Sequence, residues 1–225
     1  MAIMSSIEET KTVVQCDFDG TVTELDVSFQ LLDKFADGDW RQLLDEYREG
    51  MIPVGTFNRK AFAMVKADKQ TLLDFIFSQG DVEIRPGFDK LLACCSKNGF
   101  KFVIVSNGLD FYIEALLKDM GVEGIEVYAA KTRFNPGGLQ VEYIGPDGSI
   151  LEEGFKDAYT DLFLSKGYHV VYVGNGISDS FPAKKSHHIF ATGDLLTNCQ
   201  ENNIVCMPFN DLNEVVRGLE ILAQG

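Results

Sequence analysis

Short apolar runs alternate along this chain with longer stretches in which apolar residues recur at helical spacing. The runs are rich in Val, Ile, Phe and Tyr and are apolar on both faces, which is typical of parallel strands covered by helices. Strand–helix alternation of this kind predicts an α/β fold with an open, doubly wound parallel sheet. The predicted strands cover residues 12–16, 101–106, 125–130, 169–174 and 188–192, with a weaker candidate at 203–209.

The segment between the first two runs breaks this rhythm. It is more than eighty residues long and carries apolar residues at helical spacing, as in Leu43, Leu44 and Tyr47, but no strand-like run. We therefore expect a small helical cap at 23–84, inserted into a catalytic α/β core made of residues 1–22 and 85–225. Pro, Gly and "PDG" turn signals at 132–154 predict a hairpin or flap.

Composition and charge narrow the class of protein. Hydrophobic residues make up 45% of the 225 residues, yet no apolar run approaches the roughly 20 residues of a membrane helix. The start "MAIMSSIEETK" lacks the basic and apolar regions of a secretory signal, so we expect a cytoplasmic protein without membrane contact. The net charge of −14 argues against a nucleic-acid partner but leaves small anionic metabolites possible. The sequence leaves the oligomeric state open.

The cysteines give no sign of a disulfide framework or a zinc site. Their number is five, which is odd, and none has C-x-x-C spacing. We therefore expect reduced thiols.

Four polar clusters fall at or near the ends of predicted elements. "CDFDGT" ends the first strand, "VSNG" ends the second, Lys156 opens a predicted helix, and "GNGISD" ends the strand at 169–174. In an open α/β sheet, ligands bind at the carboxyl ends of the strands. We therefore expect the four clusters to meet in one crevice.

The first and last clusters suggest a metal and a phosphorylated substrate. Two carboxylates as close as Asp17 and Asp19 repel each other, and a divalent cation would offset that repulsion. Mg²⁺ takes oxygen ligands and is often bound by one or two carboxylates together with a substrate phosphate. An aspartate can also attack phosphorus, and a second carboxylate can move protons for it. Asn175 and Asp179 supply further oxygens on the metal side.

The middle clusters offer donors for a phosphate. Ser106, with the neighbouring Asn107 and Gly108, precedes a predicted helix start, where backbone amides can hold anionic oxygens. Lys156 would add a positive charge for the same phosphate and for Asp17. Two alternatives stay open: Ser106 as a plain helix N-cap, and Lys131 as a weaker rival for the role of Lys156.

The ordered set "DFDGT", "VIVSNG", Lys156 and "GNGISD" resembles the haloacid dehalogenase superfamily of phosphohydrolases, and the helical insert resembles the cap of its phosphoserine phosphatase-like branch. The stretches "IVSNGLDFYI" and "VYVGNGISDSFPAKKSHHIFAT" also resemble, more closely still, the 2-hydroxy-3-keto-5-methylthiopentenyl-1-phosphate phosphatases. The resemblance implies Asp17 as the nucleophile and Asp19 as the general acid and base. It also implies Mg²⁺ held by Asp17, the Asp19 carbonyl and the first acid of the last motif.

The chain departs from the family pattern at position 175, which is Asn where the family has Asp. An amide oxygen can ligate Mg²⁺ but carries no charge, so Asp179 is an alternative ligand. Three function classes follow: a Mg²⁺-dependent phosphomonoesterase on a small phosphorylated metabolite, a catalytically weak homologue that binds such a ligand, and a phosphomutase. The first is the prediction.

Substrate choice in this family comes from the cap. Asp26 stands where the phosphoserine phosphatases place an acidic substrate contact, and a helix N-cap is the competing interpretation. Arg41, Arg48 and Arg59 either meet a substrate anion or lie on helix surfaces. The sequence does not identify which metabolite is the substrate.

Overall fold

The computed structural model describes residues 11–78 and 82–224. The predicted absence of a secretory signal concerns the first ten residues and so lies outside the described part. Within the described part, no helix has the length and apolar character needed to cross a bilayer. The cytoplasmic location stays a prediction.

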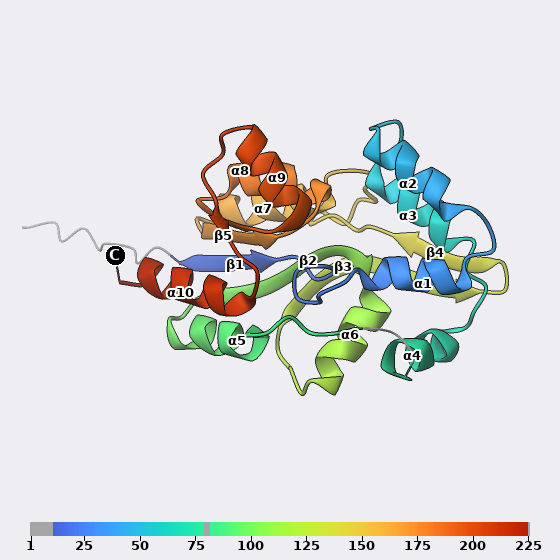
Figure 1. Cartoon of the computed structure of the whole chain (residues 1–225), viewed down its shortest axis with the longest axis horizontal. Helices are drawn as coiled ribbons and strands as arrows, with labels where there is room; N and C mark the ends of the chain where they lie inside the picture. Colours follow the sequence, from blue (N-terminus) through green and yellow to red (C-terminus); the bar gives the residue numbers. More distant parts are fainter. Residues whose placement is uncertain (1–10, 79–81, 225) are drawn as a thin grey trace, which may run out of the picture.

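A single mixed sheet of seven strands forms the centre of the described chain, in the order β4-β3-β2-β1-β5-β6-β7 (Figure 1). All neighbours are parallel except β3 and β4, and helices lie on both faces, so the predicted doubly wound α/β fold is confirmed. The strands are β1 (Thr12–Cys16), β2 (Lys101–Leu109), β3 (Glu126–Asn135), β4 (Gly138–Glu142), β5 (His169–Gly174), β6 (His188–Ala191) and β7 (Met207–Pro208).

The predicted hairpin continues directly from a core strand. The second half of β3 pairs with β4 in antiparallel register, from Lys131 opposite Glu142 to Asn135 opposite Gly138. The candidate strand at 203–209 is reduced to the two residues of β7, at the edge of the sheet. An edge strand pairs with a neighbour on one side only, so only a short part of the apolar run at 203–209 pairs as a strand.

Helices cover both faces of the sheet. Figure 1 shows α5, α6 and α10 on one side and α7, α8 and α9 on the other. The helices are α1 (Val27–Phe35), α2 (Trp40–Arg48), α3 (Val54–Phe62), α4 (Lys69–Ser78), α5 (Phe88–Lys97), α6 (Asp110–Asp119), α7 (Phe155–Ser165), α8 (Ser180–Lys185), α9 (Gly193–Glu201) and α10 (Leu212–Leu222), with a 3-10 turn at Ile177–Asp179.

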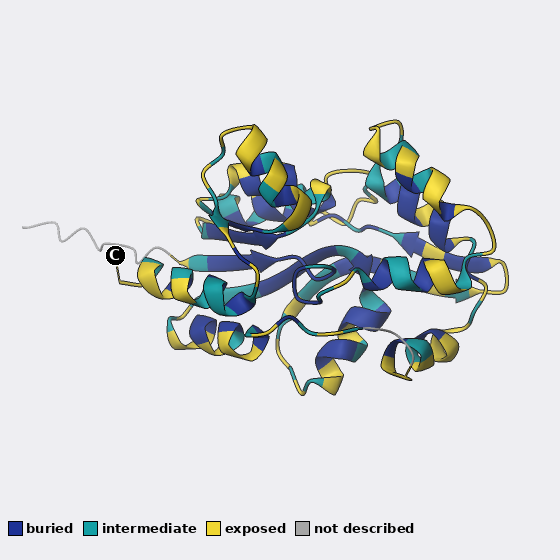
Figure 2. Cartoon of the chain, in the orientation of Figure 1, coloured by how far each residue is buried: buried dark blue, intermediate teal, exposed yellow. Residues whose placement is uncertain are grey.

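The inserted segment between β1 and β2 is helical, as predicted. Helices α2 and α3 pack on each other, and α3 lies against β4, which makes the hairpin part of their support (Figure 1). Their buried side chains, such as Trp40 and Phe57, belong to the same hydrophobic cluster as the sheet. Figure 2 shows the buried stretches of both helices. The domain boundaries at 23 and 84 stay predictions.

Candidate active site

The site begins where the central strand ends. The backbone amide of Asp17 donates to the carbonyl of Val173 on β5 (2.9 Å), and the amide of Phe18 donates to Asp17 Oδ1 (2.7 Å). Cys16, the last residue of β1, is in register with Ile104 of β2 and with Val173. The carboxyl ends of β1, β2 and β5 are therefore neighbours, as the parallel sheet requires.

The predicted residues line one cavity of about 390 Å³. Its polar wall comes from the core, and its apolar wall comes largely from the inserted helices. The predicted site residues that line it are Asp17, Asp19, Asp26, Ser106, Asn107, Gly108, Lys156 and Asn175. Asp179 lies behind this wall and has no exposed surface.

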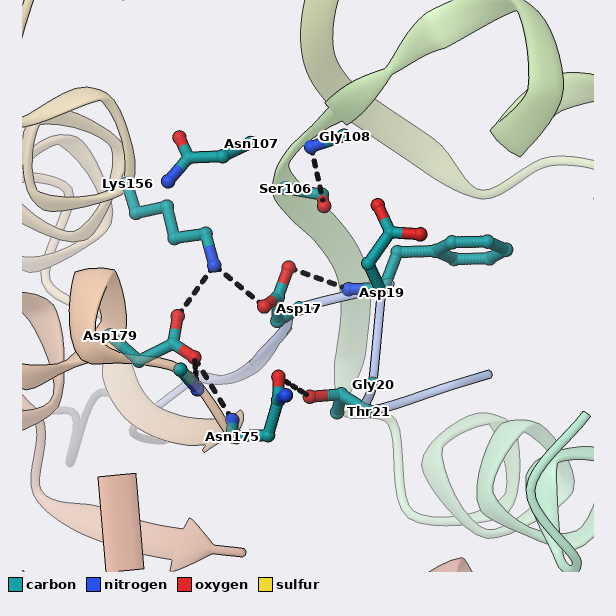
Figure 3. A network of polar contacts seen from close by, with 12 residues as sticks. Asp17, Asp19, Gly20, Thr21, Ser106, Asn107, Gly108, Lys156, Asn175 and Asp179 are labelled. Carbon is teal, nitrogen blue, oxygen red and sulfur yellow. Dashed lines mark hydrogen bonds and ion pairs between the residues drawn. The ribbon is translucent and has the colours of Figure 1, made fainter. Parts of the chain in front are cut away.

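A buried ion cluster holds the centre of the site (Figure 3). Lys156 Nζ lies 2.7 Å from Asp17 Oδ2 and 2.6 Å from Asp179 Oδ1. All three side chains are buried; Lys156 is 3% exposed. The hydroxyl of Tyr172 also donates to Asp179 Oδ1 (2.6 Å), and the amides of Asn175 and Gly176 donate to Oδ2 (2.9 and 2.8 Å).

The cluster sets the charge of its members. Burial raises the pKa of Asp17 to about 6, while the nearby Lys156 cation lowers it and Asp179 raises it further. Burial alone would lower the pKa of Lys156, but Asp17 and Asp179 outweigh burial and hold that pKa above its ordinary value. Lys156 therefore carries its positive charge at neutral pH.

The position of Lys156 depends on a polar side chain inside the central strand. Gln15 is fully buried; its Nε2 donates to the Lys156 carbonyl (3.1 Å), and its Oε1 accepts from the Thr160 hydroxyl (2.8 Å). These two bonds fasten the first two turns of α7 to β1. The lysine thereby approaches Asp17 from a fixed direction.

Asp19 faces the inserted helices. Its Oδ1 accepts from the amide of Val27 (3.0 Å), and its Oδ2 accepts from the hydroxyl of Tyr112. Burial raises the pKa of Asp19 well above its ordinary value, and Asp26 raises it further. A carboxyl group in this state keeps a proton to higher pH, as a general acid requires.

Ser106 does not cap a helix. It lies where the pairing of β2 with β3 shifts register, and α6 begins only at Asp110, with Leu109 as its N-cap. The buried Ser106 Oγ accepts from the amide of Gly108 (3.1 Å). The alternative interpretation as an N-cap is therefore wrong, because β2 continues three residues further than predicted.

The next residue, Asn107, is held by its backbone. Its carbonyl accepts from the Tyr143 hydroxyl (2.6 Å) and from Asn58 Nδ2 (3.3 Å), so the hairpin end and helix α3 both fix this turn. The Oδ1 atom of Asn107 is buried without a hydrogen-bond partner.

The metal side of the site contains Asn175. Its Oδ1 accepts from the Thr21 hydroxyl (2.8 Å), and its amide group lies against Gly20. A Cβ on Gly20 would lie 2.3 Å from Asn175 Nδ2, and Gly20 has a φ of +72°, so only glycine fits here.

These residues fit a hard cation. The Asp17 carboxylate, the Asn175 amide oxygen and the Asp19 carbonyl are all oxygen donors of the kind that Mg²⁺ takes. Among the residues that the structure describes, no group of three or more His, Cys, Asp or Glu is arranged to hold a metal. Asp179 already accepts from four donors, so we assign it a positioning role in preference to the predicted ligand role.

The remaining candidate residues divide into those that line the cavity and those that do not. Asp26 is the N-cap of α1, accepting from the amide of Phe29 (2.9 Å), and it also lines the cavity. Lys131 is half-exposed and pairs with Asp110 at 3.4 Å, away from the cavity. Arg48 lines the cavity. Arg41 and Arg59 form exposed ion pairs with Asp33 and Glu152.

Sequence reasoning missed three residues that hold the site. Tyr112 and Tyr172 are fully buried and direct their hydroxyls at Asp19 and Asp179. Arg85 donates to the carbonyls of Gly20 and Thr21 and so fixes the turn after "DFDG". A tyrosine within an apolar run was an available signal, because a buried hydroxyl needs a partner. Arg85 gave no local signal, because the carbonyls that it binds, those of Gly20, Thr21 and Asn210, lie more than sixty residues away in the sequence.

Comparisons with known proteins agree with this geometry. The family model for haloacid dehalogenase-like hydrolases matches residues 14–180. A 2-hydroxy-3-keto-5-methylthiopentenyl-1-phosphate phosphatase of Bacillus velezensis is 28% identical over 216 residues, covering 94% of this chain and 91% of its own. The enzyme of that name from Geobacillus thermodenitrificans is 28% identical over 215 residues, which cover 93% of this chain and 96% of the relative.

The fold is shared with solved phosphoserine phosphatases. A phospho-aspartyl intermediate analogue of phosphoserine phosphatase superimposes with a TM-score of 0.68 at 18% identity, covering 93% of this chain and 99% of that one. Phosphoserine phosphatase from T. onnurineus gives a TM-score of 0.66 at 19% identity, and the match covers 93% of this chain and 94% of that one. At these identities the likeness establishes the architecture and leaves the substrate open.

Proposed function

Because this chain belongs to the haloacid dehalogenase-like hydrolases, we propose that it hydrolyses the phosphomonoester of a small metabolite through a phosphate held covalently on Asp17. The observation that carries the proposal is the buried contact between Asp17 and Lys156 at 2.7 Å, on the wall of a cavity that Asp19 and Ser106 also line. The nucleophile, the acid, the cation and a hydrogen-bond donor for the phosphate thus converge from three separate parts of the sequence.

In the first step, an Asp17 oxygen attacks phosphorus and the bond to the leaving oxygen breaks. Asp19 gives its proton to that oxygen, so an alcohol departs and Asp19 becomes a carboxylate. In the second step, Asp19 takes a proton from water as the water oxygen attacks phosphorus. The bond to Asp17 breaks, and inorganic phosphate is released.

Lys156 and the turn at Ser106 bind the charge that moves during these steps. The Lys156 cation lies beside Asp17 and offsets negative charge on the phosphoryl oxygens. The Ser106 hydroxyl, which the Gly108 amide holds in place, and the Asn107 amide supply further donors. Donors fixed in advance, in a site shielded from water, are usually the largest electrostatic contribution to catalysis.

Mg²⁺ is the proposed cofactor. The residues that would hold it are Asp17, the Asp19 carbonyl and Asn175, with Asp179 fixing the loop that carries Asn175. When bound, the cation would supply Lewis-acid polarisation of the phosphoryl group.

The first substrate to test is 2-hydroxy-3-keto-5-methylthiopentenyl 1-phosphate, on which the relatives named above act. Their similarity covers more than nine-tenths of both chains. The cavity also has an apolar wall, formed by Phe29, Leu44, Tyr47, Val54 and Phe57, that suits an uncharged leaving group. Phosphoserine is the comparison substrate, because its zwitterionic leaving group lacks an apolar part.

The test is phosphate release from a panel of phosphorylated metabolites and p-nitrophenyl phosphate, with and without Mg²⁺. Turnover that disappears in Asp17→Asn supports the proposal. Ligand binding without turnover would favour a non-catalytic homologue, and an isomerised sugar phosphate as product would favour a mutase. Trapping with beryllofluoride should place the adduct on Asp17; an adduct on Asp19 would reverse the two roles.

A further inference from the structure

A continuous line of hydroxyl groups connects the proposed acid to the inserted helices. The Tyr112 hydroxyl donates to Asp19 Oδ2 and lies 2.8 Å from Ser28 Oγ. A phenol has one proton, which is donated to Asp19, so the Ser28 hydroxyl must be the donor to Tyr112. The direction of the line is therefore fixed: Ser28 donates to Tyr112, and Tyr112 donates to Asp19.

The backbone of Gly108 lies directly against the Tyr112 hydroxyl and the Asp19 carboxyl group. A Cβ on Gly108 would lie 2.2 Å from Asp19 Oδ2 and 2.3 Å from the Tyr112 hydroxyl oxygen, so a side chain at this position would separate the pair. Tyr112 is fully buried on α6 between the buried Phe111 and Ile113, where a phenylalanine would satisfy the packing. The hydroxyl therefore has a purpose beyond filling space, and its contacts point to Asp19.

We propose that Tyr112 is a positioning residue for proton delivery, which holds the Asp19 carboxyl group toward the leaving oxygen and links its orientation to helix α1 through Ser28. The proposal rests on the proposed phosphatase function. Tyr112 does not line the cavity, whereas Ser28 and Asp19 do.

The geometry explains how the carboxyl group is held. Asp19 accepts one bond on each oxygen, from Val27 on Oδ1 and from Tyr112 on Oδ2, and these two donors fix both the position and the plane of the group. Each oxygen keeps one further lone-pair direction for the transferable proton. Without Tyr112, the carboxyl group is held at Oδ1 alone and can rotate away from the leaving oxygen.

The consequence is a dependence on the leaving group. Nitrophenolate leaves as a stable anion and needs little help from an acid, whereas a benzyl alkoxide must be protonated as it leaves. The experiment therefore compares kcat/KM for p-nitrophenyl phosphate and benzyl phosphate, which are similar in size, in wild type and Tyr112→Phe. General acids contribute about 10²–10⁴-fold, so a misdirected acid should cost benzyl phosphate about tenfold more than p-nitrophenyl phosphate.

Tyr172→Phe is the matched control. Tyr172 is also a buried tyrosine that donates to a carboxylate, but that carboxylate is Asp179, which supports Lys156. Its loss should reduce kcat/KM for both substrates by the same factor. Equal losses in Tyr112→Phe, or no loss, would overturn the proposal and leave Tyr112 with a structural role only.

A second variant guards against a folding defect in Tyr112→Phe. Ser28→Ala keeps the bond from Tyr112 to Asp19 and removes only the donor behind it, so its selectivity against benzyl phosphate should have the same direction and be smaller, about threefold. Equal effects on both substrates would again contradict the proposal. If wild type hydrolyses neither compound nor any metabolite of the panel, the proposed function itself fails, which is a different result.

Discussion

Replacing Lys156 by methionine tests the centre of the site most directly, because the change removes the charged amino group and keeps an unbranched apolar side chain that is only one atom shorter. At an effective dielectric constant of about 20, contacts of 2.7 and 2.6 Å correspond to about 6 kcal/mol of gross attraction each. Desolvation of the three charged groups offsets much of this. Breaking a buried ion pair costs about 3–5 kcal/mol, which is the expected loss in the free energy of unfolding at pH 7.5.

The loss should depend on pH in a defined direction. Without the lysine, Asp17 faces Asp179 with no cation between them, so the pKa of Asp17 in the folded state rises further above its value in the unfolded state. The folded variant then takes up a proton before the unfolded chain does, and its stability rises as pH falls. The difference from wild type should therefore be smaller at pH 5.5 than at pH 7.5.

The assay is urea unfolding followed by circular dichroism at both pH values, together with turnover of p-nitrophenyl phosphate. Turnover should fall about 10²–10³-fold or more, as when one donor to a developing charge is removed. Lys131→Met is the control; it breaks a half-exposed pair and should cost below about 1 kcal/mol. The reasoning is refuted if Lys156→Met is as stable and active as wild type, or if Lys131→Met is the damaging change.

Asp17→Asn should be inactive yet more stable than wild type at pH 7.5 without metal. Burial raises the Asp17 pKa from 3.8 to about 6, so ionised Asp17 costs about 3 kcal/mol that the amide avoids, and the advantage should shrink as pH falls through 6 toward 4; an advantage that grows on acidification would contradict the assigned direction. Asn175→Asp should lower the Mg²⁺ concentration for half-maximal activity, because a full charge replaces a dipole beside Asp17. An unchanged or higher Mg²⁺ requirement in a titration at fixed ionic strength would remove Asn175 from the metal site.

Much of this protein was readable from local patterns. The apolar runs at 12–16 and 169–174 coincide with β1 and β5, because a strand buried on both faces leaves a continuous apolar signature. The crevice was also predictable, since parallel strands end at one edge of the sheet and carry their next residues to the same place. The order of the motifs and their positions at the ends of predicted elements were enough to place Asp17, Lys156 and Asn175 in this crevice.

Other features depended on contacts between distant segments. Asp179 has the sequence context of a metal ligand, but its oxygens are occupied by Lys156, Tyr172 and two amides that the fold brings to it. Ser106 has the context of a helix N-cap, but pairing with β3 carries the strand past it.

The sequence by itself determined which elements form and which side chains reach the edge of the sheet, because periodicity and strand ends are local properties. Only the tertiary structure decided what each side chain does there. A carboxylate becomes a nucleophile, an acid or a support according to the donors that surround it. In this protein Lys156 and Tyr112 lie far in sequence from Asp17 and Asp19, the carboxylates that they contact, and no local pattern encodes that pairing. Only Tyr172 lies near its partner, Asp179.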